Sequence, residues 1–283
     1  MIRVLKAGFY TSIQDRGRVG FASKGVPVSG VMDSYSADLA NRILDNSLAN
    51  ALLEITFGGC KLEFLVETTI CISGGDFSAM INNKPIVLNS RIKINKNDVL
   101  SFGNINFGAR CYLAVKGGFL TETILGSRSF YQNITKQMIL KKGDVLPILS
   151  FNNNLEASNS VIKVSCSYFK SIEINCYKGP EFELLNNHQK EQLLNTIFTI
   201  SNDNNRMGCR LNEVIDNNLP SILTSAVLVG TVQLTPSGKL IVLMRDCQVT
   251  GGYPRILQLT TAAINRLAQK TTHQNLKFIL KSI

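Results

Sequence analysis

The segment from Met244 to Arg255 holds the densest group of residues that could do chemistry. An Asp-x-Gln-x-Thr run ends in Gly-Gly-Tyr-Pro, so a carboxylate, a carboxamide and a hydroxyl precede two residues without side chains. Such a carboxylate could act as a base or orient a substrate amide, and the glycines could let the backbone approach a ligand closely. A plain hairpin turn with the tyrosine packed beneath it explains the pattern equally well. The residues concerned are Asp246, Gln248, Thr250, Gly251, Gly252 and Tyr253.

A second group lies near the N-terminus, where SIQDRGR (residues 12–18) is followed by GVPVSG (residues 25–30). Here Gln14 and Arg18 could present an amide and a guanidinium to a polar ligand. The alternative is a structural loop in which Asp15 pairs with Arg18 and the glycines make turns. The spacing alone favours this alternative.

Two further polar groups are weaker signals. Gln233 lies in GTVQLTPSG (residues 230–238), which has the pattern of a strand that runs into a turn. Arg128 lies in GSRS (residues 126–129), which could bind an anion or could be an exposed loop. An ordinary strand remains the favoured interpretation of the first.

Several familiar kinds of site are not indicated. The sequence has no GxxxxGK[ST] phosphate loop, no GxSxG nucleophile elbow and no HExxH zinc motif. Its seven cysteines are an odd number without a CxxC pair, which indicates reduced thiols in the cytoplasm and argues against a thiolate metal site. With only His188 and His273, a histidine zinc site is not expected either.

The chain is basic, with 30 lysines and arginines against 20 acidic residues. The lysines are scattered and no nucleic-acid-binding motif accompanies them, so we expect a generally solvated surface and no nucleic acid partner. The N-terminus lacks the apolar core of a signal peptide, and no run approaches the length of a membrane helix. We therefore expect a protein that does not bind membranes.

Short apolar runs broken by Gly, Asn, Asp and Pro predict a mainly β protein with a few short helices. Asn-rich turns are predicted at 82–85 and 95–98. The predicted helices cover residues 33–44, 187–196 and 260–269, the first with Asp33 as its cap. The clearest predicted strands cover residues 61–66, 68–73, 78–81, 86–88, 91–94, 99–102 and 110–115.

Two domains are predicted, over residues 1–150 and 160–283. The polar segment FNNNLEASNS (residues 151–160) has the composition of a linker. The pattern DxxRxG occurs both at 15–20 and at 203–208, which suggests that one β-domain has been duplicated.

Taken together, the motifs resemble a known family. Their order along the chain is SIQDRGRVG, GVPVSGVMD, Ala40-Asn41, Leu53-Glu54, GSRS, RMGCRL, GTVQLTPSG and DCQVTGGYPRI. This order is similar to that of the biotin-dependent carboxyltransferase family, over nearly the whole chain. The chain departs from the family near Met138-Ile139-Leu140, where a Gly-Arg pair is usual, and at Cys209, where an aromatic residue is common.

The resemblance implies two tandem cyclophilin-like β-barrel domains. It also implies the activity of the family's stand-alone members, which is the ATP-dependent conversion of 5-oxo-L-proline to L-glutamate by a 5-oxoprolinase. Such a polypeptide would act only together with a KipI-like and a LamB/YcsF-like partner, the other two components of that enzyme. ATP would be used by the complex, and the need for a metal stays open.

Chemistry and motif position suggest roles for the candidate residues. Gln14, Gln233 and Gln248 would bind the lactam N–H and C=O of the substrate. Arg18 and Arg128 would meet a carboxylate or a phosphate. Asp246 would orient the nucleophile or a metal, and the segment 250–253 would line the substrate site.

Two other functions fit the resemblance. One is the carboxyltransferase component of a urea carboxylase-like system; because the sequence has no biotin-carrier Met-Lys-Met, no bound biotin is expected. The other is a non-enzymatic, KipA-like regulator that binds a KipI-like protein. The polar groups around Asp246 argue mildly against a regulator, which would not need them.

Overall fold

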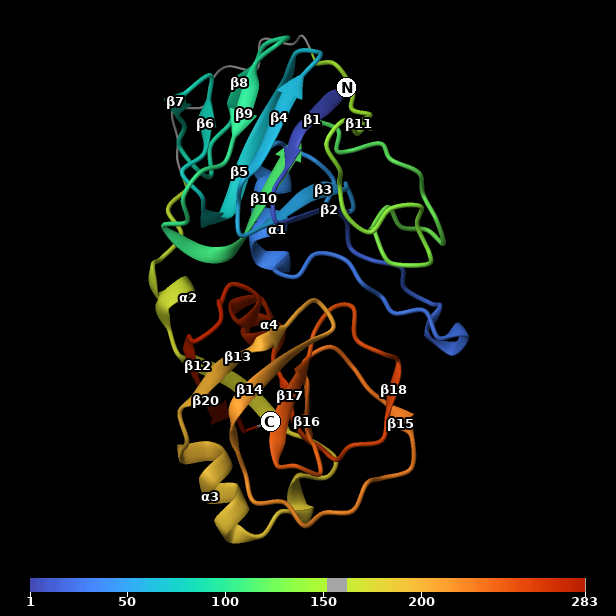
Figure 1. The fold of residues 1–283 in the computed structure, drawn as a ribbon, viewed down its shortest axis with the longest axis vertical. Helices are drawn as coiled ribbons and strands as arrows, with labels where there is room; N and C mark the ends of the chain where they lie inside the picture. The colour runs from blue at the N-terminus through green and yellow to red at the C-terminus, as the bar shows by residue number, and fades with distance from the viewer. Residues whose placement is uncertain (152–161, 283) are drawn as a thin grey trace. The chain divides into compact units, whose positions relative to one another are not determined.

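The structure, a computed structural model, describes residues 1–151 and 162–282. The chain divides into two compact units (Figure 1). Unit 1 comprises Met1–Arg18 and Ser29–Ser165, and unit 2 comprises Val19–Val28 and Cys166–Ile283. The predicted linker lies, apart from Phe151, outside the described residues, so the predicted boundaries stay a prediction. The grouping of Val19–Val28 with unit 2 was not foreseen from the sequence.

Unit 1 is built from two antiparallel sheets that share one core. One sheet has the strand order β11-β1-β4-β9-β6-β7, and the other has the order β2-β3-β10-β5-β8. The first sheet contains β11 (Val145–Leu146), β1 (Ile2–Ala7), β4 (Cys60–Phe64), β9 (Val99–Ser101), β6 (Met80–Ile81) and β7 (Lys84–Pro85). The second contains β2 (Tyr10–Gln14), β3 (Leu52–Thr56), β10 (Phe107–Val115), β5 (Thr68–Asp76) and β8 (Ile92–Ile94).

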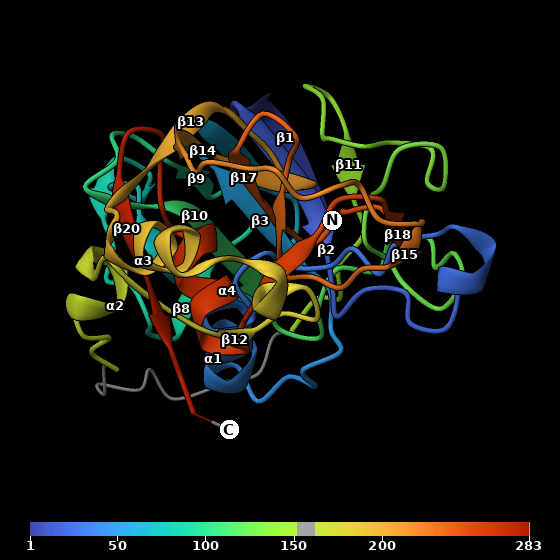
Figure 2. The same cartoon turned by 90° about the horizontal axis from the view of Figure 1, so that it is seen from below.

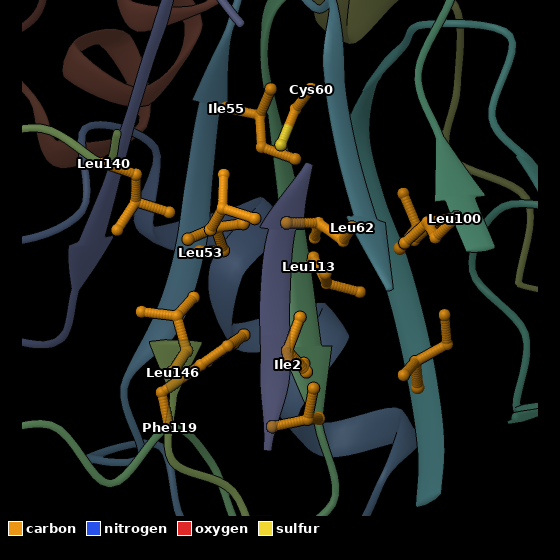
Figure 3. Close-up of a cluster of buried hydrophobic side chains, with 14 of the residues drawn as sticks. Ile2, Leu53, Ile55, Cys60, Leu62, Leu100, Leu113, Phe119, Leu140 and Leu146 are labelled. Atoms are coloured by element: carbon orange, nitrogen blue, oxygen red, sulfur yellow. The ribbon is translucent and has the colours of Figure 1, made fainter. Parts of the chain in front are cut away.

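The core of unit 1 lies between these sheets (Figure 3). Alternate side chains of each strand point inward, as the period of two requires. Leu53 and Leu113 come from one sheet, and Ile2, Leu62 and Leu100 from the other; all five are fully buried. Each such side chain stabilises the fold by about 1.5–3 kcal/mol through burial alone.

The outer face of the second sheet is covered by helix α1 (Ser34–Ile43). Asp33 caps this helix, since its carboxylate accepts the backbone N–H of Ser36. Ala37, Ala40 and Leu44 pack against the sheet in a small second core. This face is therefore closed to water, which makes its polar residues informative.

Unit 2 contains a closed seven-stranded barrel with the order β12-β19-β16-β17-β14-β13-β20. Figure 2 labels β12, β13, β14, β17 and β20 of this barrel. All neighbouring strands are antiparallel except β12 and β20, which are parallel. The interior is apolar; Val232 and Val242 are examples of its fully buried side chains. The strands are β12 (Glu173–Lys178), β13 (Phe198–Asn204), β14 (Gly208–Val214), β16 (Thr231–Leu234), β17 (Lys239–Leu243), β19 (Arg255–Leu259) and β20 (Asn275–Leu280).

A two-stranded ribbon made of β15 (Ser225–Ala226) and β18 (Thr250–Gly251) completes unit 2 (Figure 1). Val227 and Cys247, which flank it, pack with Leu243 of the barrel in a small apolar cluster. The helices are α2 (Ser167–Lys170), α3 (Asn187–Asn195) and α4 (Thr261–Ala268), with 3₁₀ turns at Ala22–Lys24 and Phe182–Leu184.

The predicted mainly β class is confirmed, with a closed barrel in unit 2 and two sheets around one core in unit 1. The three predicted helices are present as α1, α3 and α4, each shorter than predicted by one or two residues because the capping residue lies outside the helix. The strand predicted at 86–88 is wrong. The chain pairs at Lys84–Pro85 instead, across a tight turn at Asn82 and Asn83.

Candidate functional site

The carboxylate of Asp15 is the centre of a hydrogen-bonded cluster in unit 1. Its Oδ1 accepts the hydroxyls of Ser127 at 2.6 Å and Ser129 at 2.7 Å, and the backbone N–H of Gly17 at 2.8 Å. Its Oδ2 accepts the backbone N–H of Arg128 at 2.6 Å. Asp15 is 9% exposed, so these donors replace water around the charge. We call Asp15, Ser127, Arg128 and Ser129 the Asp15 clamp.

The two neighbours of Asp15 in the motif hold the same loop. Gln14 donates its amide to the carbonyl of Phe130 at 3.3 Å, and Arg18 donates to the carbonyl of Ser129. Both side chains are buried, at 0% and 1% exposure. Gln14 and Arg18 therefore fasten residues 129–130 in this structure, and their roles as direct substrate contacts stay predictions.

The loop that is held in this way turns sharply. Leu125 and Gly126 have φ angles of 52° and 75°, and Ile124 pairs with Ser127 across them. A leucine in this left-handed region is strained, and surrounding contacts must enforce such a conformation. The hydrogen bonds that Ser127, Arg128 and Ser129 donate to the Asp15 carboxylate are contacts of that kind.

A row of buried polar residues crosses the sheet beneath α1. Ser12, Glu54, Tyr112 and Ser73 are paired in register on four neighbouring strands. Glu54 accepts the backbone N–H of Met32 at 2.7 Å. The row as an arrangement was not predicted from the sequence, although Glu54 lies inside the apolar run Leu52–Ile55 and belongs to the motifs of the family resemblance.

The Tyr112 hydroxyl of this row accepts the backbone N–H of Asp33 at 2.8 Å, and so fixes the start of α1. Burial, reinforced by the nearby Glu54, raises the pKa of Tyr112 well above its ordinary value.

Gly30 lies against the Asp15 segment, where a Cβ would come within 2.9 Å of the Asp15 carbonyl oxygen. Only glycine fits this approach at a φ of 89°.

In unit 2, Asp246 is engaged by an arginine. Arg206 donates from Nε to Oδ2 at 2.7 Å and from Nη2 to Oδ1 at 3.0 Å. The two residues are 6% and 7% exposed, so this is a buried, bidentate ion pair. A catalytic or metal-orienting role for Asp246 stays a prediction, and it would require Arg206 to share or release the carboxylate.

Gln233 points outward from barrel strand β16 and is covered by the ribbon. It is 1% exposed, and its Nε2 has no hydrogen-bond partner among the described residues. A Cβ on Gly251 would lie 2.6 Å from this nitrogen, so the ribbon rests directly on the amide. The structure thus brings two of the predicted site residues together.

The ribbon is anchored by Arg255 of strand β19, which pairs with Gln233 of the adjacent strand β16. Its Nη1 donates to the Ser225 hydroxyl and to the Ala226 carbonyl, both at 2.9 Å. Its Nε and Nη2 bond both carboxylate oxygens of Glu181, at 3.0 and 2.8 Å. These hydrogen bonds lower the pKa of Glu181 and raise the pKa of Arg255.

The remaining predicted residues are accessible. Gln248 and Thr250 are exposed, Tyr253 is 38% exposed, and Gly252 accepts the backbone N–H of Ile222. Arg128 in unit 1 is partly exposed. These accessible side chains are the ones able to meet a ligand without rearrangement.

Unit 1 also contains a groove of about 320 Å³, close to the lower end of the range of small-molecule sites. Its lining includes Phe130, Gln137, Asp144 and Leu146, with Glu122 and Lys136 3.4 Å apart beside them. Phe130 is the residue whose carbonyl Gln14 holds. Across residues 1–151 and 162–282, no three His, Cys, Asp or Glu side chains lie close enough to share a metal ion.

In the same residues, no helix has the length and hydropathy needed to cross a bilayer. The cysteines are free, and all but Cys166 are buried. Burial raises the pKa of the Cys60 and Cys71 thiols to about 12. These thiols are therefore unreactive and pack as apolar side chains.

Three protein comparisons bear on this arrangement. The C subunit of 5-oxoprolinase from Escherichia coli (strain K12) is 30% identical over 290 residues, which cover 100% of this chain and 92% of the relative. The polypeptide of the same name from Haemophilus influenzae is 28% identical over 286 residues, 98% of this chain and 90% of its own. The urea amidolyase of Lachancea kluyveri is 34% identical over 225 residues, 74% of this chain but 12% of that protein.

Solved structures agree with the sequence comparisons. K. lactis urea amidolyase superposes with a TM-score of 0.86 at 28% identity, over 99% of this chain and 19% of that chain. The protein TTHA0988 superposes with a TM-score of 0.87 at 25% identity, over 98% of this chain and 55% of that chain. The model of the family described as carboxyltransferase domain, subdomain A and B, matches residues 24–280. The chain therefore belongs to this carboxyltransferase family, as its motifs predicted.

Proposed function

We propose that the chain is the C subunit of an ATP-dependent 5-oxoprolinase, which converts 5-oxo-L-proline to L-glutamate together with two partner polypeptides. The observation that carries this proposal is the match to the E. coli protein of that name, which spans all of this chain and 92% of the relative. A second protein of the same name matches over 98% of this chain. Both relatives correspond to the whole chain and not to one of its units.

The chemistry of the reaction makes use of such a chain. Amide resonance protects a lactam from water, and phosphorylation of its carbonyl oxygen would activate it. Transfer of a phosphoryl group depends mainly on positioning and on positive electrostatics. In this chain Arg128 supplies an accessible positive charge, and Gln248 and Thr250 supply accessible hydrogen-bonding groups. The buried Gln14, Arg18 and Gln233 would act by holding the segments that carry such groups.

The proposal requires partner polypeptides. In urea amidolyase and in TTHA0988 the matching fold is joined to further polypeptide, since this chain covers 19% and 55% of those chains. A stand-alone form would need to recruit the corresponding partners without a covalent link. A KipI-like protein and a LamB/YcsF-like protein are the expected partners.

The test is reconstitution. The chain is co-expressed with the KipI-like and LamB/YcsF-like proteins, and the hydrolysis of ATP and the formation of glutamate are measured with and without 5-oxo-L-proline. Activity should require all three polypeptides. Full activity of the two partners without this chain, or no oxoproline-dependent activity in the purified ternary complex, would contradict the proposal.

A matched pair of variants tests the ribbon segment. Gln248→Ala and Asn195→Ala each remove an exposed carboxamide from unit 2, the first from the motif and the second from helix α3. Exposed substitutions of this kind change stability by within about 0.5 kcal/mol. Gln248→Ala should raise the KM for oxoproline, whereas Asn195→Ala should leave it unchanged. Equal kinetics of both variants would remove Gln248 from the site.

A second candidate function is supported by the urea amidolyase comparisons, which reach 34% identity in sequence and a TM-score of 0.86 in structure. In this candidate the chain is the carboxyltransferase component of a split, urea carboxylase-like system. Because the sequence has no Met-Lys-Met, biotin would have to arrive on a separate carrier protein. Avidin would then abolish urea-dependent activity, whereas it would leave an oxoprolinase unaffected.

A further inference from the structure

We propose that Arg128 binds an anionic group of a ligand, and that Asp15 is the positioning residue that holds it in place. The inference rests on the proposed function only for the identity of the ligand. The geometry that carries it lies wholly within unit 1.

The backbone of Arg128 is fixed from three sides. Asp15 accepts its N–H at 2.6 Å and also holds the hydroxyls of Ser127 before it and Ser129 after it. Ser129 is bonded a second time, because its hydroxyl accepts the backbone N–H of Asp15 at 3.0 Å. The sharp turn at Leu125 and Gly126 precedes these bonds. Little entropy is therefore left to lose when this loop binds a ligand.

The guanidinium of Arg128 is available. It is partly exposed, and within residues 1–151 and 162–282 no side chain or carbonyl bonds it. Three other arginines of unit 1 are used differently: Arg3, Arg16 and Arg91 pair with acidic side chains. A free guanidinium on a fixed backbone suits the planar, two-point recognition of a carboxylate or phosphate.

The way in which Asp15 is satisfied explains why it does not capture this arginine. Its two oxygens accept two hydroxyls and two backbone N–H groups, which lie around the carboxylate at 2.6–2.8 Å. The charge is thus stabilised by short, neutral donors. The carboxylate organises the backbone of the loop and leaves the guanidinium to an external anion.

Two sources of such an anion follow from the proposed reaction: the carboxylate of 5-oxo-L-proline and a phosphoryl group of ATP. The experiment uses the full chain alone, so that its outcome does not depend on the partner polypeptides. The side-chain Nε resonances of arginine are followed by NMR during separate titrations with 5-oxo-L-proline, inorganic phosphate and ATP. Arg128→Ala assigns the resonance, and Arg42→Ala is the control for an exposed arginine on α1.

At least one titration should shift the Arg128 resonance, and the affinity should fall about tenfold or more in Arg128→Ala, a loss typical of one charge-assisted contact. Arg42→Ala should bind as the wild type does. A response to oxoproline alone identifies the carboxylate source, and a response to phosphate and ATP identifies the phosphoryl source. Equal affinity of Arg128→Ala and wild type for all three anions would overturn the proposal.

The positioning role of Asp15 is tested by coupling. Asp15→Asn should weaken anion binding several-fold and speed the hydrogen exchange of residues 124–130. In Arg128→Ala, the further change Asp15→Asn should have no additional effect on binding, because both act through one contact. A merely structural role of Asp15 would give additive losses, and that result would refute the positioning role.

Ser127→Ala provides a milder variant if Asp15→Asn does not fold, since it removes only one of the four bonds to the carboxylate. Ser127→Ala should weaken anion binding less than Asp15→Asn does, and it too should cause no additional loss of binding in Arg128→Ala. Additive losses of binding would refute the positioning role of Asp15 in this case as well. The outcome is separable from the proposed function. Loss of anion binding in Arg128→Ala of the chain alone supports the inference even where the ternary complex turns over no oxoproline.

Discussion

Asp15 in unit 1 and Asp246 in unit 2 are both buried motif aspartates, and different groups satisfy their carboxylates. In unit 1, the carboxylate of Asp15 is bonded by two serine hydroxyls and two backbone N–H groups. In unit 2, the carboxylate of Asp246 is bonded by both arms of the Arg206 guanidinium. The aspartates have nearly the same exposure, 9% and 7%, so the difference lies in the donors.

This difference decides what each site can offer to a ligand. Neutral donors stabilise the charge of Asp15 while the guanidinium of Arg128 stays available. In unit 2 the guanidinium of Arg206 is bonded to the Asp246 carboxylate, so a ligand of either group would have to share the pair or open it. A buried aspartate near an arginine therefore does not by itself indicate which of the two groups can bind a ligand.

The comparison also bears on the repeated DxxRxG pattern. Asp15 follows strand β2 and is buried, whereas Asp203 lies at the end of β13, at the hairpin to β14, and is exposed. Arg18 bonds a backbone carbonyl, but Arg206 bonds a carboxylate. The two copies of the pattern thus differ in the burial of the aspartate and in the partner of the arginine, and duplication of the units stays a prediction.

The largest expected effect comes from breaking the ion pair of unit 2. Asp246→Ala should lower the free energy of unfolding of this unit by about 3–5 kcal/mol, because it leaves the Arg206 guanidinium buried without this carboxylate. Hydrogen exchange of the barrel strands measures the loss for unit 2 alone, which avoids assuming that both units unfold together.

Two controls accompany this variant. Asp203→Ala removes the exposed aspartate of the DxxRxG pattern and should change stability by less than about 0.5 kcal/mol. Replacing both partners, Arg206→Met with Asp246→Leu, should recover most of the loss, since a buried pair can be exchanged for apolar groups. If Asp246→Ala were as mild as Asp203→Ala, the ion pair would not stabilise unit 2 and the contrast between the units would fail.

A smaller effect is expected where the ribbon meets Gln233. A Cβ at position 251 would lie 2.6 Å from the Gln233 Nε2, whereas at position 252 the nearest atom is the Ile222 oxygen at 3.4 Å. Gly251→Ala should therefore cost about 1 kcal/mol, the low end of the overpacking range because the nearest atom ends a flexible side chain, and Gly252→Ala clearly less. Thermal unfolding and the hydrogen exchange of residues 222–227 measure both.

The same contact predicts a rescue. Gln233→Ala in the Gly251→Ala background removes the atom that the new methyl group meets, so stability should return toward that of Gln233→Ala alone. Equal stability of the two glycine variants would mean that the ribbon does not press on the glutamine. The amide of Gln233 would then have room to reach a ligand.

How well the sequence predicted these features depends on how local their causes are. The helix cap at Asp33 and the turn at Asn82–Asn83 are made by residues within three positions of one another, and they were predicted. The polar residues of the motifs were also singled out from the sequence, and their roles at a site stay predictions. Their partners were not predicted, because Asp15 meets a loop more than 110 residues away and Arg206 lies 40 residues from Asp246.

Burial was the other quantity that the sequence did not reveal. Gln14, Arg18 and Gln233 were predicted to face a ligand, and each is at most 1% exposed. Their polarity looked functional because polar side chains are rare in strand interiors. What places them inside is cover from other elements, such as the ribbon over Gln233, and this cover is not encoded near them in the chain.

A third prediction concerns the strained turn that precedes Arg128. Leu125 is 38% exposed and has a φ of 52°, so its side chain contributes little packing while its backbone is unfavourable. Leu125→Asn should stabilise unit 1 by up to about 1 kcal/mol, since asparagine tolerates the left-handed region, and Leu125→Val should destabilise it by a similar amount. If Leu125→Asn and Leu125→Val both changed hydrogen exchange in the same direction, the Asp15 clamp would not impose the left-handed backbone conformation on residue 125.

The smallest effect concerns a second ion pair of unit 2, which is mostly buried but more exposed than the pair of Arg206 and Asp246. Arg255 holds Glu181 in the same bidentate way as Arg206 holds Asp246, but with side chains 19% and 14% exposed. Hydrogen bonds from Arg255 lower the pKa of Glu181 below 4.5, and those from Lys178 and Lys190 lower the pKa of the exposed Glu183 to about 2. A carboxylate with a lowered pKa adds stability above its unfolded pKa and loses it as the pH falls through the folded value.

Unit 2 should therefore lose stability between about pH 4.5 and about pH 2, measured as the fall in the urea midpoint. Glu181→Gln should flatten this dependence at both low and high salt, because Glu181 is largely shielded from solvent. Glu183→Gln should flatten it only at low salt, because Glu183 is exposed and its ion pairs are screened. If salt erased both contributions equally, the Arg255–Glu181 pair would behave as a surface contact. It could then not anchor the ribbon.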